Sequence, residues 1–132
     1  MAINNLTKIY SDIDLAFTKK PSTKDIALSY DTQAVIRSVR NLLLTRNYER
    51  PFQPSIGSNI DAVLFEMVSP LSASVLKTEI ERTIENFEPR ADVQDVVVTV
   101  LPDNNAYSAS ITFFIENATE PTVLNFILQR NR

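Results

Sequence analysis

The pattern of hydrophobic and polar positions divides the chain into a first part with helical spacing and a second part with strand spacing. Over residues 32–46, apolar residues recur every three or four positions, which places them on one face of a helix. Asp31 directly precedes this segment and belongs to the residue types favoured at helix N-caps. We therefore expect an amphipathic helix here. Upstream, residues 25–30 fit a short strand, and residues 19–23 fit a loop.

The segment after this helix contains strong turn signals. Residues 47–57 include two prolines and Gly57, the only glycine of the chain, so we expect a loop or a short hairpin. Ser58 is followed three residues later by Asp61, which resembles a capping box with a shorter acid. This pattern predicts a short helix that continues to Glu66.

The clearest helical pattern begins at Pro70 and ends before Pro89. A proline disfavours the helical conformation of the residue before it, so the helix should stop near Glu88. The expected buried stripe consists of Leu76, Ile80, Ile84 and Phe87.

Beyond Pro89 the hydrophobic period changes to two, which is typical of strands. Residues 102–106 are rich in Asp and Asn and predict a turn between two of these strands. A third strand is expected over residues 123–129, although leucine and glutamine also favour a helix there. The alternating apolar residues are Val96, Val98 and Val100, then Tyr107, Ala109, Ile111, Phe113 and Ile115, then Leu124, Phe126 and Leu128. The pattern predicts an α+β fold, N-terminal helices followed by a small antiparallel sheet, in a single domain over residues 1–132.

Composition excludes several kinds of catalytic site. The chain has neither histidine nor cysteine, which excludes Ser-His-Asp and Cys-His nucleophiles, thiol redox chemistry, and zinc sites with nitrogen or sulfur ligands. A single glycine also excludes a glycine-rich phosphate loop. We therefore expect no cofactor.

Charge and hydropathy argue against two further classes of partner. The net charge is −3 and the pI is about 4.9, whereas nucleic-acid binding usually requires a basic face. No apolar run approaches the length that spans a bilayer, and residues 1–10 lack the pattern of a signal peptide. We expect a soluble protein that binds neither nucleic acid nor membrane.

Carboxylates are the remaining candidates for chemistry. Glu49, Glu66 and Glu88 lie near expected loops or helix ends, where two of them could form a glycosidase pair about 5 Å or about 6.5–9.5 Å apart. With 16 acidic residues in the chain, solvated charges or salt bridges are the favoured interpretation. Asp12 and Asp14 resemble a metal pair only weakly, because no turn glycine lies between them. We expect no catalytic residue and no metal site.

The tripeptide Glu88-Pro89-Arg90 is more specific. Proline restricts the backbone, so an acid and a guanidinium lie at a rigid corner between helix and strand. Arginine is suited to bidentate contacts. From the residues alone, a docking site and a helix terminator with an internal ion pair are equally good interpretations.

Several short segments, in their order and spacing, resemble the baseplate wedge proteins of contractile-tailed phages, also called sheath initiators. This family has counterparts in type VI secretion baseplates, and the resemblance covers nearly the whole chain. The segments are Tyr10–Asp14, Thr45-Arg46, Glu49–Phe52, Gly57, Leu64–Glu66 and Asn86–Arg90.

The resemblance implies a structural, non-enzymatic subunit of a contractile tail. Its expected partners are other baseplate wedge subunits and the tail sheath protein, with the tail tube or hub as further candidates. Its expected location is the virion tail baseplate, after assembly in the host cytoplasm. Members of the family have also been labelled lysozyme-like, so a tail glycoside hydrolase is the alternative function.

The resemblance also implies two partner-binding regions. One is the corner Glu88, Pro89 and Arg90, to which we add Arg46 and Arg50 as candidate contacts with wedge subunits. The other is the last strand, whose edge is expected to exchange strands with the sheath, guarded by Arg130 and Arg132. Its candidate residues are Val123, Asn125, Ile127 and Gln129.

Two local expectations follow. Family members often have glycine where this chain has Tyr48, and a tyrosine rarely adopts positive φ, so the turn after the first helix is expected to differ. If the Glu88–Arg90 corner faces a partner, both charges should be largely solvated in the free chain. Arg90→Ala would then leave melting nearly unchanged while assembly fails.

Overall fold

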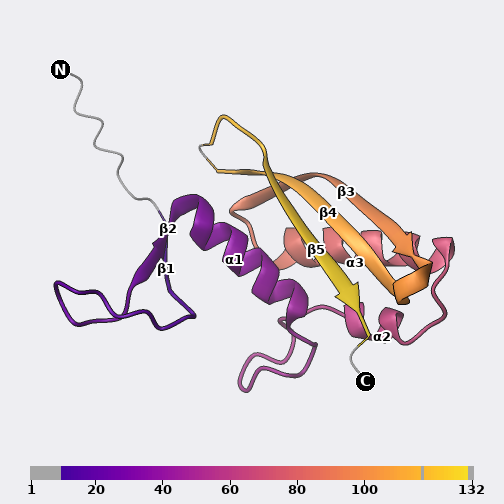
Figure 1. The fold of residues 1–132 in the computed structure, drawn as a ribbon, viewed down its shortest axis with the longest axis horizontal. Helices are drawn as coiled ribbons and strands as arrows, with labels where there is room; N and C mark the ends of the chain where they lie inside the picture. Colours follow the sequence, from indigo (N-terminus) through magenta and orange to yellow (C-terminus); the bar gives the residue numbers. More distant parts are fainter. Residues whose placement is uncertain (1–9, 117, 131–132) are drawn as a thin grey trace. The chain divides into compact units, whose positions relative to one another are not determined.

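The structure is a computed structural model that describes residues 10–116 and 118–130. By their contacts the residues group into two compact units, the first reaching Arg37 and the second beginning at Ser38. Helix α1 (Asp31–Leu44) runs from the first unit into the second (Figure 1). The two units are described in turn.

The first unit is a small hairpin that leads into α1. Strands β1 (Ser11–Ile13) and β2 (Leu28–Tyr30) pair antiparallel. The strand expected over residues 25–30 is confirmed for its last three residues, whereas β1 was not predicted. A segment of three residues is too short to show the alternation that identifies a strand.

Helix α1 begins at Asp31 and ends at Leu44, two residues earlier than expected. The Asp31 carboxylate accepts a hydrogen bond from the backbone N–H of Tyr10 at 3.2 Å, which connects the start of the helix to the hairpin. At the other end, the Thr45 hydroxyl donates to the carbonyl of Asn41 at 2.7 Å. This is a local side-chain bond of the kind that competes with further helix growth.

Helix α2 (Ile60–Leu64) forms in the expected region but ends before Glu66. The expected capping box is wrong. The Ser58 hydroxyl donates to the carbonyl of Leu43 at 2.7 Å, and the residue at the N-cap is Asn59, which makes no side-chain cap. Local spacing placed Ser58 at a helix cap, but Ser58 instead makes a tertiary contact with the end of α1.

Helix α3 (Pro70–Phe87) confirms the clearest pattern of the sequence. Ser69 has extended backbone angles, and its side chain accepts from the N–H of Ser72 at 3.1 Å. Pro70 follows at the first helical position, where its missing N–H costs no intrahelical bond. The helix stops before Glu88, as the following proline predicts.

The second unit contains a three-stranded antiparallel sheet in the order β3-β4-β5 (Figure 1). Its strands are β3 (Ala91–Leu101), β4 (Ala106–Ile115) and β5 (Thr122–Gln129). A 3-10 turn, η1 (Pro102–Asn104), joins the first two, and Asn105 after it is left-handed with φ of 48°. The third strand is confirmed, and the competing helix over residues 123–129 is wrong.

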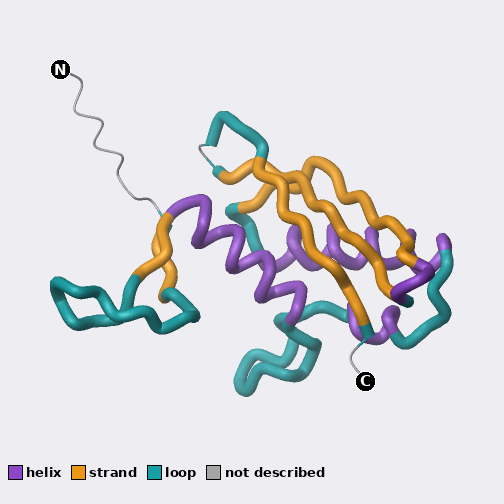
Figure 2. Tube along the Cα trace, viewed as in Figure 1, coloured by secondary structure: helices purple, strands orange, loops and turns teal. Residues whose placement is uncertain are grey.

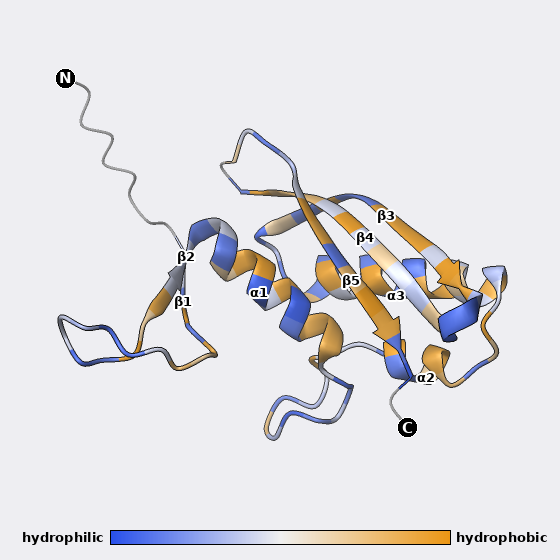
Figure 3. Cartoon of the chain, in the orientation of Figure 1, coloured by the Kyte–Doolittle hydropathy of each residue, from blue (hydrophilic) through white to orange (hydrophobic). Residues whose placement is uncertain are grey.

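Helix α3 covers one face of this sheet, so the sheet is buried on that side alone (Figures 1 and 2). Hydrophobic residues occur along all three strands, and the α3 side chains that face them are completely buried (Figure 3). The largest buried side chains of this core are Leu76, Ile80 and Ile84 of α3, with Val96, Tyr107, Ile111 and Phe113 of the sheet. The α+β fold class, with helices followed by a small antiparallel sheet, is confirmed.

Candidate docking surfaces

The Glu88–Arg90 corner connects α3 to β3. Glu88 is only 4% exposed, and its carboxylate accepts two hydrogen bonds from the Arg90 guanidinium, at 2.6 and 2.9 Å. The Ser38 hydroxyl of α1 also donates to the same carboxylate. The proline between them is exposed, and the Arg90 side chain is 23% exposed. The corner is therefore an internal clamp between α1, α3 and β3 with an open outer side.

This geometry sets the charge state of the corner. Burial raises the pKa of Glu88, but the hydrogen bonds from Arg90 and Ser38 and the charge of Arg90 outweigh burial, so the pKa lies below its usual value. The expectation that both charges are solvated in the free chain is wrong, because Glu88 is buried. Ser38 was missed because a serine on an amphipathic helix shows no pattern that identifies its distant partner.

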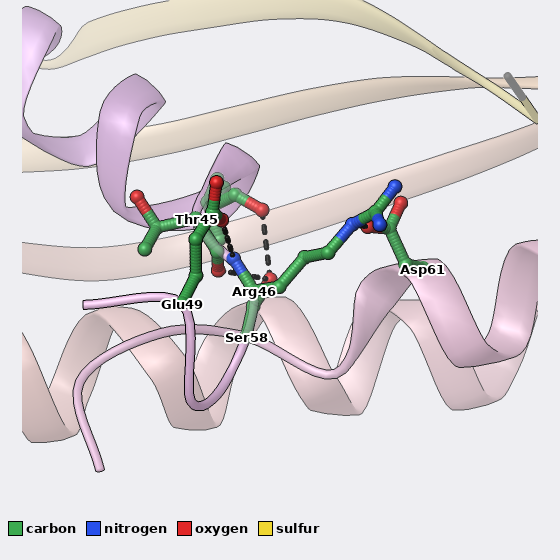
Figure 4. A network of polar contacts seen from close by, with 6 residues as sticks. Thr45, Arg46, Glu49, Ser58 and Asp61 are labelled. Atoms are coloured by element: carbon green, nitrogen blue, oxygen red, sulfur yellow. Dashed lines mark hydrogen bonds and ion pairs between the residues drawn. The ribbon is translucent and has the colours of Figure 1, made fainter. Parts of the chain in front are cut away.

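The loop between α1 and α2 is held by a network of polar contacts (Figure 4). The Arg46 side chain extends to the Asp61 carboxylate at the start of α2, and the two form an ion pair. The backbone N–H of Arg46 donates to the Glu49 carboxylate at 2.9 Å, and the N–H of Ser58 donates to the carbonyl of Thr45 at 2.9 Å. These contacts hold the two ends of the loop side by side.

The same loop carries two exposed aromatic residues in unusual backbone conformations. Tyr48 has φ of 67° and Phe52 has φ of 70°, and both side chains are exposed. Tyr48 therefore adopts a positive φ that a tyrosine rarely takes. The N–H of Tyr48 donates to the carbonyl of Pro54 at 2.8 Å, which stabilises that conformation.

The two loop arginines differ in their surroundings. Arg46 is fixed by Asp61, whereas Arg50 is exposed at the tip of the loop. A cavity of about 450 Å3 lies beside Arg46 and Glu49, and its other walls come from α1, α2 and the C-terminal end of β5. Arg46 therefore lies near the C-terminal end of β5. The Glu88–Arg90 corner follows the C-terminal end of α3.

Strand β5 pairs with β4 on one side and is an edge strand of the sheet. Its candidate residues alternate along one face, and all four are exposed, with Val123 at 52% and Ile127 at 66%. The set consists of Val123, Asn125, Ile127 and Gln129. Just beyond the strand, the Arg130 guanidinium lies over the Phe65 ring at 5.1 Å from its centroid, and Arg132 lies outside the described residues.

The other candidate carboxylates have different surroundings. Asp14 pairs with Arg37; its pKa is lowered chiefly by the N–H of Ala16, with Arg37 adding to the effect. Glu66 is exposed, and Glu49 accepts the N–H of Arg46. Within residues 10–116 and 118–130, no group of three or more acidic side chains is placed to hold a metal ion. In the same residues, no helix is long and apolar enough to cross a membrane.

Comparison with solved structures shows that chains of two baseplate assemblies and one other protein have a similar fold. A Geobacter sulfurreducens protein described as a candidate tail lysozyme matches with a TM-score of 0.71 and 18% identity, over 80% of this chain and 96% of that one. A chain of the anti-feeding prophage baseplate matches with a TM-score of 0.64 and 21% identity, over 93% of this chain and 87% of its own. A chain of the type VI secretion baseplate complex matches with a TM-score of 0.63 and 18% identity, over 74% and 92%.

Sequence comparison gives the family. The baseplate wedge protein gp25 of Enterobacteria phage T4 is 35% identical over 104 residues, which cover 79% of this chain and 76% of that protein. The family profile described as "Baseplate wedge protein gp25" matches residues 29–120, which include α1, the loop after it, the Glu88–Arg90 corner and most of the sheet. The chain belongs to the family of the baseplate wedge protein gp25.

Proposed function

We propose that this protein is a structural subunit of a contractile-tail baseplate that docks on wedge subunits and initiates the tail sheath by strand exchange at β5. Membership of the baseplate wedge family supports the baseplate location. We further propose that the protein is located in the tail baseplate of the virion and is assembled in the host cytoplasm.

The observation that carries sheath initiation is the edge position of β5. An edge strand presents unpaired N–H and C=O groups that can add a strand from a partner, while side-chain contacts at alternate positions give specificity. On β5 these alternate positions hold exposed apolar side chains at Val123 and Ile127, which would pack against an incoming strand. The role requires no catalytic group.

Docking on wedge subunits is assigned to the open side of the Glu88–Arg90 corner. Pro89 is exposed, and Arg90 keeps part of its guanidinium accessible while it binds Glu88. The clamp fixes the direction of the arginine before a partner arrives, so less side-chain entropy is lost on binding. Arg50, exposed at the loop tip, is the second candidate contact for wedge subunits.

The experiment that tests sheath initiation is Ile127→Pro in baseplates assembled from purified components. Proline removes a backbone donor and is tolerated on an edge strand, so the domain should fold while strand addition fails. We expect baseplates that contain the variant at normal stoichiometry but do not polymerise sheath. Ile127→Lys, which leaves the backbone intact and adds a charge at the edge, should also reduce polymerisation.

The matched control is Val97→Pro, an exposed position on β3, the other edge strand of the same sheet. Baseplates with this variant should still grow sheath wherever the variant folds, as judged by circular dichroism. Normal sheath growth on Ile127→Pro baseplates would exclude the β5 edge as the template.

A further inference from the structure

The N-terminal hairpin, residues 11–30, exposes large apolar side chains of the kind that an isolated domain usually buries. Five large apolar side chains are between 40% and 65% exposed, while Ser29 is buried. We call these five the hairpin cluster: Ile13, Leu15, Phe17, Ile26 and Leu28. Hydrophobic residues recur along the hairpin in Figure 3. Exposed apolar clusters of this kind mark interaction sites.

The backbone holds the hairpin cluster in a defined arrangement. Ile13 and Leu28 are cross-strand partners, so their side chains lie on the same face. The hairpin is closed by backbone hydrogen bonds from Ala27 to Thr18 at 2.7 Å and from Lys20 to Asp25 at 2.8 Å. A two-stranded hairpin of this size is marginally stable in water by itself, so cover on its apolar side chains would stabilise it.

The charge and size of the cluster indicate what covers it. The hairpin has three acidic and three basic residues, so its charges balance and do not favour a strongly charged partner. At about 200 Å2 for a fully exposed large side chain, the exposed fractions of the cluster amount to roughly 500 Å2. A stable pairwise interface buries about 800 Å2 on each partner, so the cluster is too small to hold two copies of this chain together alone.

One comparison bears on the occupant of the hairpin cluster. The family profile includes only residues 29 and 30 of the hairpin, so it gives no information on the hairpin cluster. The matched chain of the anti-feeding prophage baseplate, however, covers 93% of the 132 residues, which leaves about nine unmatched, fewer than the hairpin contains. The match to this baseplate chain therefore includes at least part of the hairpin.

We propose that the hairpin cluster is a second docking surface, which binds an apolar, weakly charged patch on another baseplate subunit. The proposal rests on the baseplate function proposed above, but it concerns a different surface from β5 and the Glu88–Arg90 corner. In a multi-subunit assembly, contacts elsewhere supply the area that the hairpin cluster lacks.

The first test is incorporation of Ile13→Ser with Leu28→Ser into purified baseplates. We expect incorporation to fall at least about tenfold, because two apolar contacts are lost, with circular dichroism to check that the free chain still folds. The control, Lys20→Ser with Lys24→Ser, changes two residues of the same hairpin outside the cluster and should incorporate normally. If the double variant does not fold, Leu15→Ser tests the same cluster outside the paired strands.

The second test places a benzophenone amino acid at position 15 and irradiates purified baseplates. A crosslink to another baseplate subunit is expected. A crosslink to a second copy of this chain, or no crosslink in intact baseplates, would overturn the proposal, as would normal incorporation of the serine variants. The two proposals are separable, because hairpin variants act on incorporation whereas Ile127→Pro acts on sheath growth after incorporation.

Discussion

At the scale of single residues, the role of a charged side chain depends on which residues distant in the sequence bind and bury it. Glu88 and Arg90 are two positions apart, and their spacing is compatible with a solvated docking motif or an internal pair. The structure brings Ser38 from α1 against the same carboxylate and buries it. The pair therefore contributes to folding, whatever it does in the assembly.

This clamp makes a prediction for Arg90→Ala. Removing one partner of a buried pair leaves an uncompensated charge and costs about 3–5 kcal/mol. Because Arg90 is partly exposed, we expect the lower end, a loss of about 3 kcal/mol in the free energy of unfolding. For a domain of this size the melting temperature should fall by roughly 10 °C. Differential scanning calorimetry of the free chain measures this.

The control is Lys77→Ala on α3, where Lys77 forms exposed pairs with Glu81 at 3.9 Å and Asp95 at 3.7 Å. Exposed pairs contribute about 0–1 kcal/mol, so melting should change little. If Arg90→Ala melts at the wild-type temperature while baseplate assembly fails, the corner serves in docking and not in folding.

Tyr48 gives a second prediction at this scale. A side chain in the left-handed region costs about 1–2 kcal/mol, while glycine loses about 0.5–1 kcal/mol in unfolded-state entropy. Tyr48→Gly should therefore raise the free energy of unfolding by up to about 1 kcal/mol, measured by urea denaturation. Arg50→Gly, in the same loop without positive φ, should lower it, and equal effects of the two changes would rule out strain at Tyr48.

At the scale of elements, the loop after α1 depends on the one glycine of the chain. A Cβ on Gly57 would lie 2.7 Å from the carbonyl oxygen of Arg46, and its φ of 152° is one that other residues rarely adopt. The close approach of the two loop ends therefore requires glycine. This explains why a loop rich in exposed side chains can hold a defined shape.

We expect Gly57→Ala to destabilise the chain by about 2–3 kcal/mol, because the backbone of Arg46 must move and the fastening of the loop is lost. Chemical denaturation followed by circular dichroism measures the change. Ser55→Ala, two residues earlier and exposed, should cost less than about 0.5 kcal/mol. A small effect at Gly57 would mean that the loop can rearrange without cost.

At the scale of the whole molecule, Glu88 is the buried one of the three candidate carboxylates, whereas Glu49 and Glu66 are exposed. A general acid needs a raised pKa, whereas Arg90 and Ser38 lower the pKa of Glu88. The likeness to a candidate tail lysozyme, at 18% identity, concerns the fold. The proposed role is instead that of a scaffold with three docking surfaces, the β5 edge, the Glu88–Arg90 corner and the N-terminal hairpin.

We therefore predict that the purified protein does not clear peptidoglycan at any concentration, with hen egg-white lysozyme as the positive control in the same turbidity assay. Dose-dependent clearing that Glu49→Gln, Glu66→Gln or Glu88→Gln abolishes would contradict the structural role.

The sequence by itself determined the elements whose signals are local. The period of 3.6 in α3, the period of two in β4 and β5, and the proline that ends α3 act between near neighbours, so the α+β fold was readable from the residue pattern. The order of short motifs identified the family. The candidate docking residues lie where the sequence predicted, between α3 and β3 and on β5, and their docking role stays a prediction.

Only the tertiary structure decided what individual polar side chains do. Ser58 binds the carbonyl of Leu43 instead of capping α2, Asp31 binds Tyr10, and Glu88 is buried by a serine 50 residues away. These partners are distant in sequence, and no spacing rule encodes them. The same holds for the hairpin, because three-residue strands show no periodicity and exposure depends on what packs nearby. Local physics thus selects the elements, and long-range packing assigns the side chains their roles.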